Sequence, residues 1–339
     1  MSEITTIGID LAKHSFQLHG VDAGGVVVLR RTLRRHQLAA FFKDLPRCVV
    51  GMEACATSHY WAREIAGFGH DVRLMPPQYV KAYVKRNKND AADAEAICEA
   101  VLRPSMRFVP IKTIEQQSTL MLHRARELLV GQRTMSINAL RAHLAEFGIV
   151  APQGVHRVGE LAAIVTDESD TRVPEHARVV LKILVDQIGV LTKQIEAIEG
   201  RISGWHRSNA VSQRLAGIPG IGPIIASAIV ASVPDASVFR AGREFAAWLG
   251  LVPRQTGTGG KTHLGPISKR GDGYLRRLLV NGAMTALMRS KAIKASAWVA
   301  GMKARQKRPI VIAVALANKM ARIAWALMAR GGTYRATAA

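Results

Sequence analysis

The sequence predicts an α/β domain at the N-terminus, a long helical connector, and a mostly α C-terminal domain. Three observations support this order. Short β-branched segments alternate with helical segments as far as residue 75. Long apolar repeats with helical spacing follow between residues 113 and 203. Residues 201–339 then carry 22 Lys and Arg against three acidic residues.

The N-terminal segments predict a mixed sheet. Runs rich in Val, Ile and Thr are typical of strands, and Gly-rich clusters between them are typical of turns. We expect strands at 4–9, 15–20, 26–32, 48–52 and 71–75, and helices at 37–44 and 57–67. Three early strands followed by alternating helix and strand indicate both antiparallel and parallel pairing.

The connector is predicted to consist of two long helices, 113–147 and 175–203, separated by a Pro- and Gly-containing segment with one short helix. Apolar residues in the second helix alternate steps of four and three, which is a heptad seam. The seam consists of Leu184, Ile188, Leu191, Ile195, Ile198 and Ile202. Two interpretations stay open: a hairpin that also joins protomers, and a helical bundle inside one chain.

The C-terminal part contains LAGIPGIGPIIASAIVASV at 215–233, with a Pro-Gly-Ile-Gly turn between two apolar helical segments. This spacing is typical of a helix-hairpin-helix, in which backbone N–H groups at a helix N-terminus hold a phosphate. Gly220 and Gly222 are the candidate phosphate-binding residues. The alternative is an ordinary turn between two helices.

The charge indicates the class of partner. The chain carries a formal net charge of +22, and nearly all of the excess lies after residue 200. Such a surface suits a polyanion, most commonly nucleic acid. A surface that merely maintains solubility is the alternative, but it would not require this asymmetry.

Other classes fit poorly. The three cysteines lack paired spacing, which argues against disulfides and structural zinc and suits a reducing cytoplasm. The first ten residues, MSEITTIGID, do not have the pattern of a signal peptide. The apolar stretch from Ile310 to Leu327 is interrupted by Asn318, Lys319 and Arg322, so we expect no membrane partner.

Four acidic residues form the candidate catalytic centre. Asp10 and Glu53 end two predicted strands, and Asp90 and Asp93 lie three apart on a predicted helix and therefore share one face. Oxygen-only ligands suit Mg²⁺, with Mn²⁺ as the alternative ion. Two such ions about 4 Å apart would activate a nucleophile and stabilise a leaving oxygen. Asn89 and Asp90 also suit a helix N-cap, which is the structural alternative.

Several motifs carry a family resemblance. They are GID at 8–10, MEA around Glu53, KNDAADAEAI ending at Ile97, LAGIPGIGPIIASAI, FAAWLGLVPRQ and TGTGGKTHLGPISKRGDGYLRRLLVNGA. In this order they resemble the DEDD transposases of the insertion-sequence family numbered 110. The resemblance covers nearly the whole chain.

The resemblance implies a domain plan and an activity. Residues 1–111 would form a ribonuclease H-class, RuvC-like nuclease domain, 112–205 a coiled-coil connector for oligomerisation, and 206–339 the transposase domain. Members of this family are dimers or tetramers that recombine DNA under the guidance of an RNA transcribed from the element. A DEDD tetrad binds metal, and a serine of the C-terminal domain becomes covalently linked to DNA. Domains of different protomers form the active site. A bacterial, cytoplasmic and nucleoid-associated location follows.

One position departs from the family pattern. A serine commonly precedes Gly-Gly-Lys in this family, whereas this chain has Thr258 there. A threonine hydroxyl is a competent nucleophile when a base or metal activates it. Thr256 and Ser268 are the alternatives, and an inactive element is a third.

Basic residues around this run are the candidate nucleic-acid ligands: Arg254, Lys261, Lys269, Arg270, Arg276 and Arg277. Ordinary solvated charge is the alternative for each. Two other functions compete with a transposase: a junction nuclease that uses the tetrad and water, and a non-enzymatic nucleic-acid-binding protein.

Overall fold

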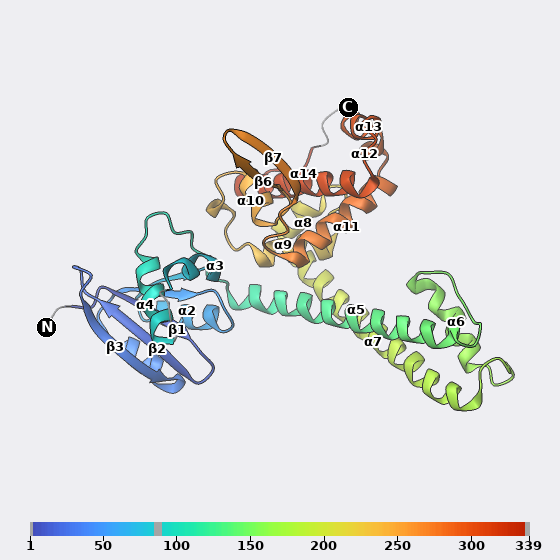
Figure 1. Ribbon diagram of the computed structural model, residues 1–339, viewed down its shortest axis with the longest axis horizontal. Helices are drawn as coiled ribbons and strands as arrows, with labels where there is room; N and C mark the ends of the chain where they lie inside the picture. Colours follow the sequence, from blue (N-terminus) through green and yellow to red (C-terminus); the bar gives the residue numbers. More distant parts are fainter. Residues whose placement is uncertain (1–2, 85–89, 336–339) are drawn as a thin grey trace. The chain divides into compact units, whose positions relative to one another are not determined.

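The computed structural model describes residues 3–84 and 90–335, which form two compact units (Figure 1). The first unit comprises Met1–Thr113 and the second Ile114–Ala339. The helical connector and the basic part therefore pack together in one unit. The expected division after residue 205 falls inside helix α7, Glu175–Ser208, and the three-part division stays a prediction.

A five-stranded mixed sheet forms the first unit, with the strand order β3-β2-β1-β4-β5. The three antiparallel strands come first in the chain, and β4 and β5 then join in parallel. The mixed sheet is as expected. Its strands are β1 (Thr6–Leu11), β2 (Ser15–Val21), β3 (Val27–Arg34), β4 (Val49–Glu53) and β5 (Asp71–Met75).

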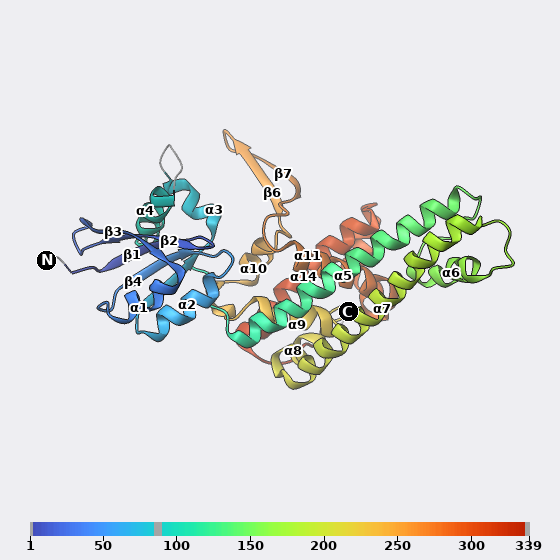
Figure 2. The same cartoon turned by 90° about the horizontal axis from the view of Figure 1, so that it is seen from below.

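Helices cover both faces of this sheet (Figure 2). On one face, α1 (Leu38–Lys43) and α2 (Ser58–Gly67) pack against a core that contains Phe16 and Trp61, with ring centroids 5.4 Å apart. On the other face, α4 (Asp90–Val101) contacts β1, β2 and β4. A single turn of helix, α3 (Pro77–Val80), follows β5. The face under α4 carries the candidate site.

The second unit begins with a helical hairpin. Helices α5 (Ile114–Ala145) and α7 pack side by side along their length, and α6 (Val158–Thr166) lies between them in sequence. The heptad residues Ile188, Leu191, Ile195 and Ile202 are buried in this single chain. Leu184 and Ile198 are partly buried, and α5 packs along α7 within the same chain. A hairpin that also joins protomers stays a prediction.

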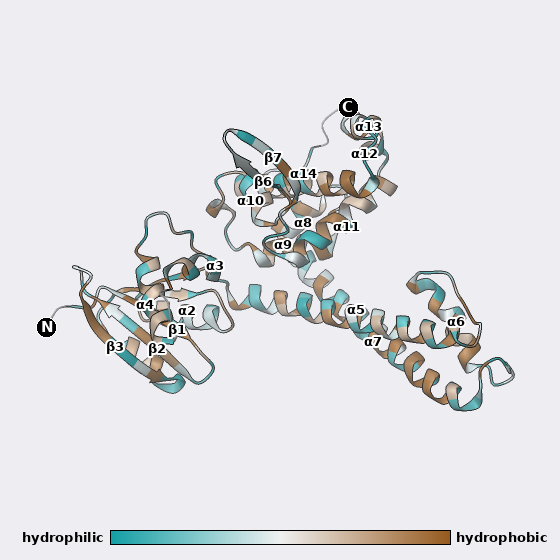
Figure 3. Ribbon diagram, viewed as in Figure 1, coloured by the Kyte–Doolittle hydropathy of each residue, from teal (hydrophilic) through white to brown (hydrophobic). Residues whose placement is uncertain are grey.

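Helices also dominate the rest of this unit. They are α8 (Ala210–Ala216), α9 (Pro223–Ser232), α10 (Gly242–Trp248), α11 (Gly273–Arg289), α12 (Lys291–Ala295), α13 (Ala297–Ala304) and α14 (Pro309–Arg330). Helix α14 is long and apolar enough to cross a membrane, and it is largely brown in Figure 3. Half of its most apolar window is buried in the protein, and it packs against α10 and α11. Its apolarity is that of a core helix.

The run around Thr258 forms a β-hairpin that the sequence analysis missed. Strands β6 (Pro253–Thr258) and β7 (Lys261–Ile267) pair antiparallel on either side of Gly259 and Gly260. The C-terminal part is otherwise helical, as predicted, and this two-stranded hairpin is an addition to it. Both glycines have positive φ, +56° and +77°, as a tight two-residue hairpin turn requires.

A buried polar network joins three helices of the second unit. His123 of α5 is fully buried, with Nε2 3.1 Å from the Ser227 hydroxyl of α9 and Nδ1 3.0 Å from the Tyr274 hydroxyl of α11. Because Ser227 donates to the Pro223 carbonyl, it accepts from His123 Nε2–H, and Tyr274 then donates to Nδ1. The histidine is neutral in this arrangement. Burial, and then the positive charge of Arg126, lowers the pKa of His123 to about 4.

We expect acid to destabilise the second unit through His123. Between pH 6.5 and 4 the unfolded chain binds a proton at His123 that the folded chain does not, so stability falls as pH falls. The unfolding free energy should drop by about 2 kcal/mol from pH 7 to pH 5 because of this group. Urea unfolding at both pH values measures it. His123→Gln should lose this dependence, and His143→Gln, at an exposed position of the same helix, should keep it.

Candidate active site

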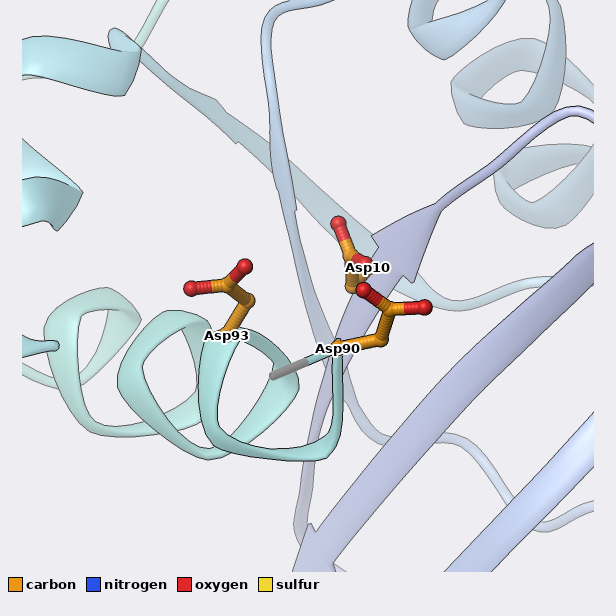
Figure 4. A group of neighbouring side chains, drawn as sticks. All are labelled: Asp10, Asp90 and Asp93. Carbon is orange, nitrogen blue, oxygen red and sulfur yellow. The ribbon is translucent and has the colours of Figure 1, made fainter. Parts of the chain in front are cut away.

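Three of the four predicted carboxylates lie together. One carboxylate oxygen each of Asp10, Asp90 and Asp93 lies within 4.8 Å of the other two. Asp10 projects from β1, and both other residues project from the first turn of α4 (Figure 4). Asp10 and Asp93 are half-buried and Asp90 is exposed. We call these three residues the acidic cluster.

Two glycines bring α4 down onto the sheet. A Cβ on Gly8 would lie 2.3 Å from the Ala94 carbonyl oxygen, and one on Gly51 would lie 2.9 Å from the Val101 side chain. Asp10 is two residues beyond Gly8 on the same face of β1, about 6.6 Å along the strand. Asp90 is four residues before Ala94, about 6 Å along the helix. The distance from Gly8 to Asp10 along β1 is therefore close to the distance from Ala94 to Asp90 along α4. The first turn of α4 consequently lies over Asp10.

The donor set fits a hard divalent cation. Three carboxylates this close repel one another unless a cation neutralises them or they take up protons. Oxygens on one Mg²⁺ lie at most about 4.2 Å apart, since each bond is about 2.1 Å long. The oxygens of the acidic cluster, all within 4.8 Å of one another, would have to approach by only a few tenths of an ångström to share one ion. Asn89, the other half of the alternative N-cap, lies outside the described residues.

Glu53 lies beside the acidic cluster, although its carboxylate is not among the three whose oxygens lie within 4.8 Å of one another. The parallel pair Ile9 and Met52 directly precedes Asp10 and Glu53, so these two residues are neighbours across β1 and β4. The charges of Asp10 and Glu53 both act on the Cys55 thiol. Desolvation raises the pKa of Cys55, and the carboxylates of Glu53 and Asp10 raise it further.

The candidate nucleophile lies at the tip of the β6–β7 hairpin. Thr258 is exposed, is the last residue of β6 and pairs with Lys261 across the turn. Thr256 lies two residues earlier on the same strand face, opposite His263. Ser268 is at the base of the hairpin, where its N–H donates to the Val252 carbonyl at 2.8 Å. Thr256 and Thr258 are both exposed, and Thr258 is the one at the tip.

The predicted basic ligands fall into two groups. Four are exposed on or beside the hairpin: Arg254, Lys261, Lys269 and Arg270. Arg254 also donates to the Ser268 carbonyl at 3.3 Å, and the other two contact the protein as well. Arg276 donates to the Leu249 carbonyl at 2.9 Å, and Arg277 forms an ion pair with Glu127 of α5. Arg277 is exposed too, but Glu127 matches its charge, so the four residues on or beside the hairpin are the better placed for phosphates.

The predicted phosphate-binding turn lies between α8 and α9. Gly220 has φ +92°, and a Cβ there would lie 2.6 Å from the Gly282 carbonyl oxygen of α11. This close approach alone requires a glycine. Gly222 is exposed and precedes Pro223 at the start of α9. A phosphate contact at either glycine stays a prediction.

Sequence reasoning missed two features. The hairpin was recognisable from two Gly residues flanked by equal polar runs, a pattern typical of a tight hairpin turn. The second feature is a row of polar residues beside Asp10 on β2 and β3. Strand alternation puts Gln17 and His19 on the face of Asp10, but only the observed register reveals that.

Two family models match the chain. A transposase model of the DEDD type from IS110 elements covers residues 7–149. A second model, described as the transposase IS116/IS110/IS902 family, covers residues 212–297. The first match contains the acidic cluster and Glu53, and the second contains the hairpin.

Named relatives match over nearly their full length. A protein of Pseudomonas aeruginosa named "Probable family 20 transposase" is 51% identical, over 98% of this chain and 99% of its own. "Putative transposase y4pF/y4sB" of Sinorhizobium fredii is 46% identical, over 99% and 87%. A "Transposase for insertion sequence element IS1328" of Yersinia enterocolitica is 43% identical, over 98% and 99%.

Proposed function

Because the chain belongs to the IS116/IS110/IS902 family of transposases, we propose that it cuts and rejoins DNA through a covalent threonine–DNA intermediate. The observation that carries this proposal is the acidic cluster of Asp10, Asp90 and Asp93, with oxygens within 4.8 Å. A cluster of this kind suits phosphodiester chemistry assisted by Mg²⁺ or Mn²⁺.

The proposed step divides the work between two parts of the chain. Asp10, Asp90 and Asp93, with Glu53 beside them, would hold the divalent ion, which would activate the attacking hydroxyl and stabilise the leaving oxygen. The Thr258 oxygen attacks phosphorus and gives its proton to solvent or a carboxylate. One phosphorus–oxygen bond to Thr258 forms while one bond of the strand breaks, and the leaving strand oxygen takes a proton. Attack by a strand hydroxyl later reverses these changes and frees Thr258.

The remaining parts of the proposal concern partners. The exposed Lys and Arg side chains on or beside the hairpin suit DNA phosphates. The resemblance to the family adds a guide RNA transcribed from the element. We propose that a dimer or tetramer joins the hairpin of one protomer to the acidic cluster of another. Action on chromosomal DNA places the protein in the bacterial cytoplasm, in association with the nucleoid.

A nuclease that uses water is the second candidate, since the acidic cluster alone suffices for hydrolysis. The exposed hydroxyl at a glycine-rich tip favours the covalent route instead. The two candidates differ in one product. Only the covalent route leaves protein attached to a cut strand.

The full-length protein, with the guide RNA and labelled element ends, tests the function. With Mg²⁺ we expect cut strands that enter a denaturing gel only after protease treatment, because they carry the protein. EDTA should abolish both the cut and the adduct, and Mn²⁺ should restore both. Cutting that persists in EDTA would contradict the metal-dependent site. Cut strands that migrate freely without protease would favour hydrolysis.

A further inference from the structure

A polar cavity lies next to the acidic cluster, on the same face of the sheet. It has a volume of about 370 Å³ and is bounded by β2, β3 and the first turns of α4. Its lining includes Gln17, His19, Arg30, Arg31, Thr32 and Glu95. We call it the Arg30 cavity.

The strand register connects this cavity to Asp10. Asp10 pairs with Gln17 of β2, and Gln17 pairs with Thr32 of β3. These side chains therefore form one row across the sheet, on the face that α4 covers. The neighbouring row runs from Gly8 through His19 to Arg30. A ligand that leaves the acidic cluster toward β3 enters the cavity without crossing the sheet.

The chemistry of the cavity wall changes along this row. On the α4 side it is acidic, with Glu95 following the cluster residues Asp90 and Asp93. On the β3 side it presents the exposed Arg30 and the Thr32 hydroxyl, which donates to Gln17 Oε1 at 2.7 Å. His19 completes the floor and is only 5% exposed. A guanidinium beside polar hydrogen-bonding groups suits a phosphate.

We propose that the Arg30 cavity holds a backbone phosphate of the nucleic-acid strand that is cut at the acidic cluster. This inference rests on the proposed function and adds a subsite to it. Neighbouring strands lie about 4.8 Å apart, so β3 is about 10 Å from β1. The subsite would therefore receive a phosphate flanking the scissile one, on its β3 side. Arg30 would fix the register of the strand over the cluster.

Nucleic-acid substrates in which one phosphate is replaced by an uncharged methylphosphonate linkage test this inference on the full-length protein. The linkage is moved one phosphate at a time away from the cut site. For the wild type we expect one flanking position at which the neutral linkage slows cutting about tenfold, since it removes a charge-assisted hydrogen bond. Arg30→Gln should cut an unmodified strand about tenfold more slowly. It should lose nothing further when that same phosphate is neutral.

Arg31→Gln is the matched control. Arg31 also borders the cavity, but its guanidinium carbon lies 5.7 Å from the Phe41 ring of α1, on the opposite face of the sheet. Its profile should equal that of the wild type. Two results would overturn the subsite. One is an equal loss of cutting rate in Arg31→Gln. The other is an Arg30→Gln variant whose cutting rate still falls when the same phosphate is neutral.

A binding measurement separates this inference from the proposed function. Affinity for the same strands in EDTA requires no cutting, and it should show the same single position of sensitivity in the wild type and not in Arg30→Gln. A wild type that shows this position but never cuts would contradict the proposed function alone. A wild type that cuts but has no such position would contradict the subsite alone.

Discussion

Replacing Asp10 with Asn should reduce strand cutting by about a hundredfold to a thousandfold, the scale of loss when a key stabilising group is removed from an active site. Asp10 is the one member of the acidic cluster that lies on the sheet, and the oxygens of Asp90 and Asp93 lie within 4.8 Å of its own. An amide removes one negative charge and one strong ligand oxygen. Binding of nucleic acid should remain, because the exposed Lys and Arg side chains that would bind it lie on or beside the hairpin and are unchanged.

A thermal measurement gives the same prediction a readout other than cutting. In EDTA the unfolding temperature of the variant should be no lower than that of the wild type, because the substitution removes one of three negative charges that repel one another. Mn²⁺ should raise the unfolding temperature of the wild type, since it binds the folded state, and should do so far less for Asp10→Asn.

The matched control is Asp44→Asn, an exposed position that ends α1 on the other face of the sheet. It should cut and respond to Mn²⁺ like the wild type. If Asp10→Asn keeps wild-type cutting with Mg²⁺, the acidic cluster is not the metal site.

Replacing Thr258 with Ala should abolish the covalent adduct completely while leaving nucleic-acid binding intact. The hydroxyl is the only nucleophile of this side chain, and its exposed position at the end of β6 makes the loss of a methyl contact inconsequential for packing. Thr258→Ser should retain or raise activity, because serine keeps the hydroxyl and lacks the methyl group that crowds the attack.

Thr262→Ala is the control for the hairpin itself. Thr262 is exposed and lies one position beyond Lys261 on β7, on the strand face opposite to Thr258. Its variant should form the adduct normally. Digesting the trapped complex and locating the nucleotide by mass spectrometry identifies the linked residue. A nucleotide on Thr256 or Ser268 would reassign the nucleophile, and cutting without any adduct would favour hydrolysis by water.

Local pattern was sufficient for the strands of the first unit. Short apolar or β-branched runs bounded by turn signals predicted all five, and the observed ends differ from the expected ones by a few residues. The helical spacing likewise predicted α5 and α7. These signals are local because backbone preference and burial on one face depend on neighbouring side chains in the same segment.

The hairpin around Thr258 shows where local pattern misleads. Its strands are exposed throughout, apart from the last residue, so no apolar alternation marks them. Their glycines suggest a loop if they are considered for flexibility alone. In the structure two of them adopt the positive φ of a tight turn, and cross-strand pairing orders the rest.

The sequence by itself determined which acidic residues end strands, which residues form the heptad seam, and that positive charge gathers after residue 200. Tertiary structure decided what these residues meet. It placed Asp90 and Asp93 over Asp10 because Gly8 and Gly51 leave room for α4. It buried four of the six seam residues and directed Arg276 to the Leu249 carbonyl. The physical reason is that such contacts join segments far apart in the chain, and close packing of whole elements selects them.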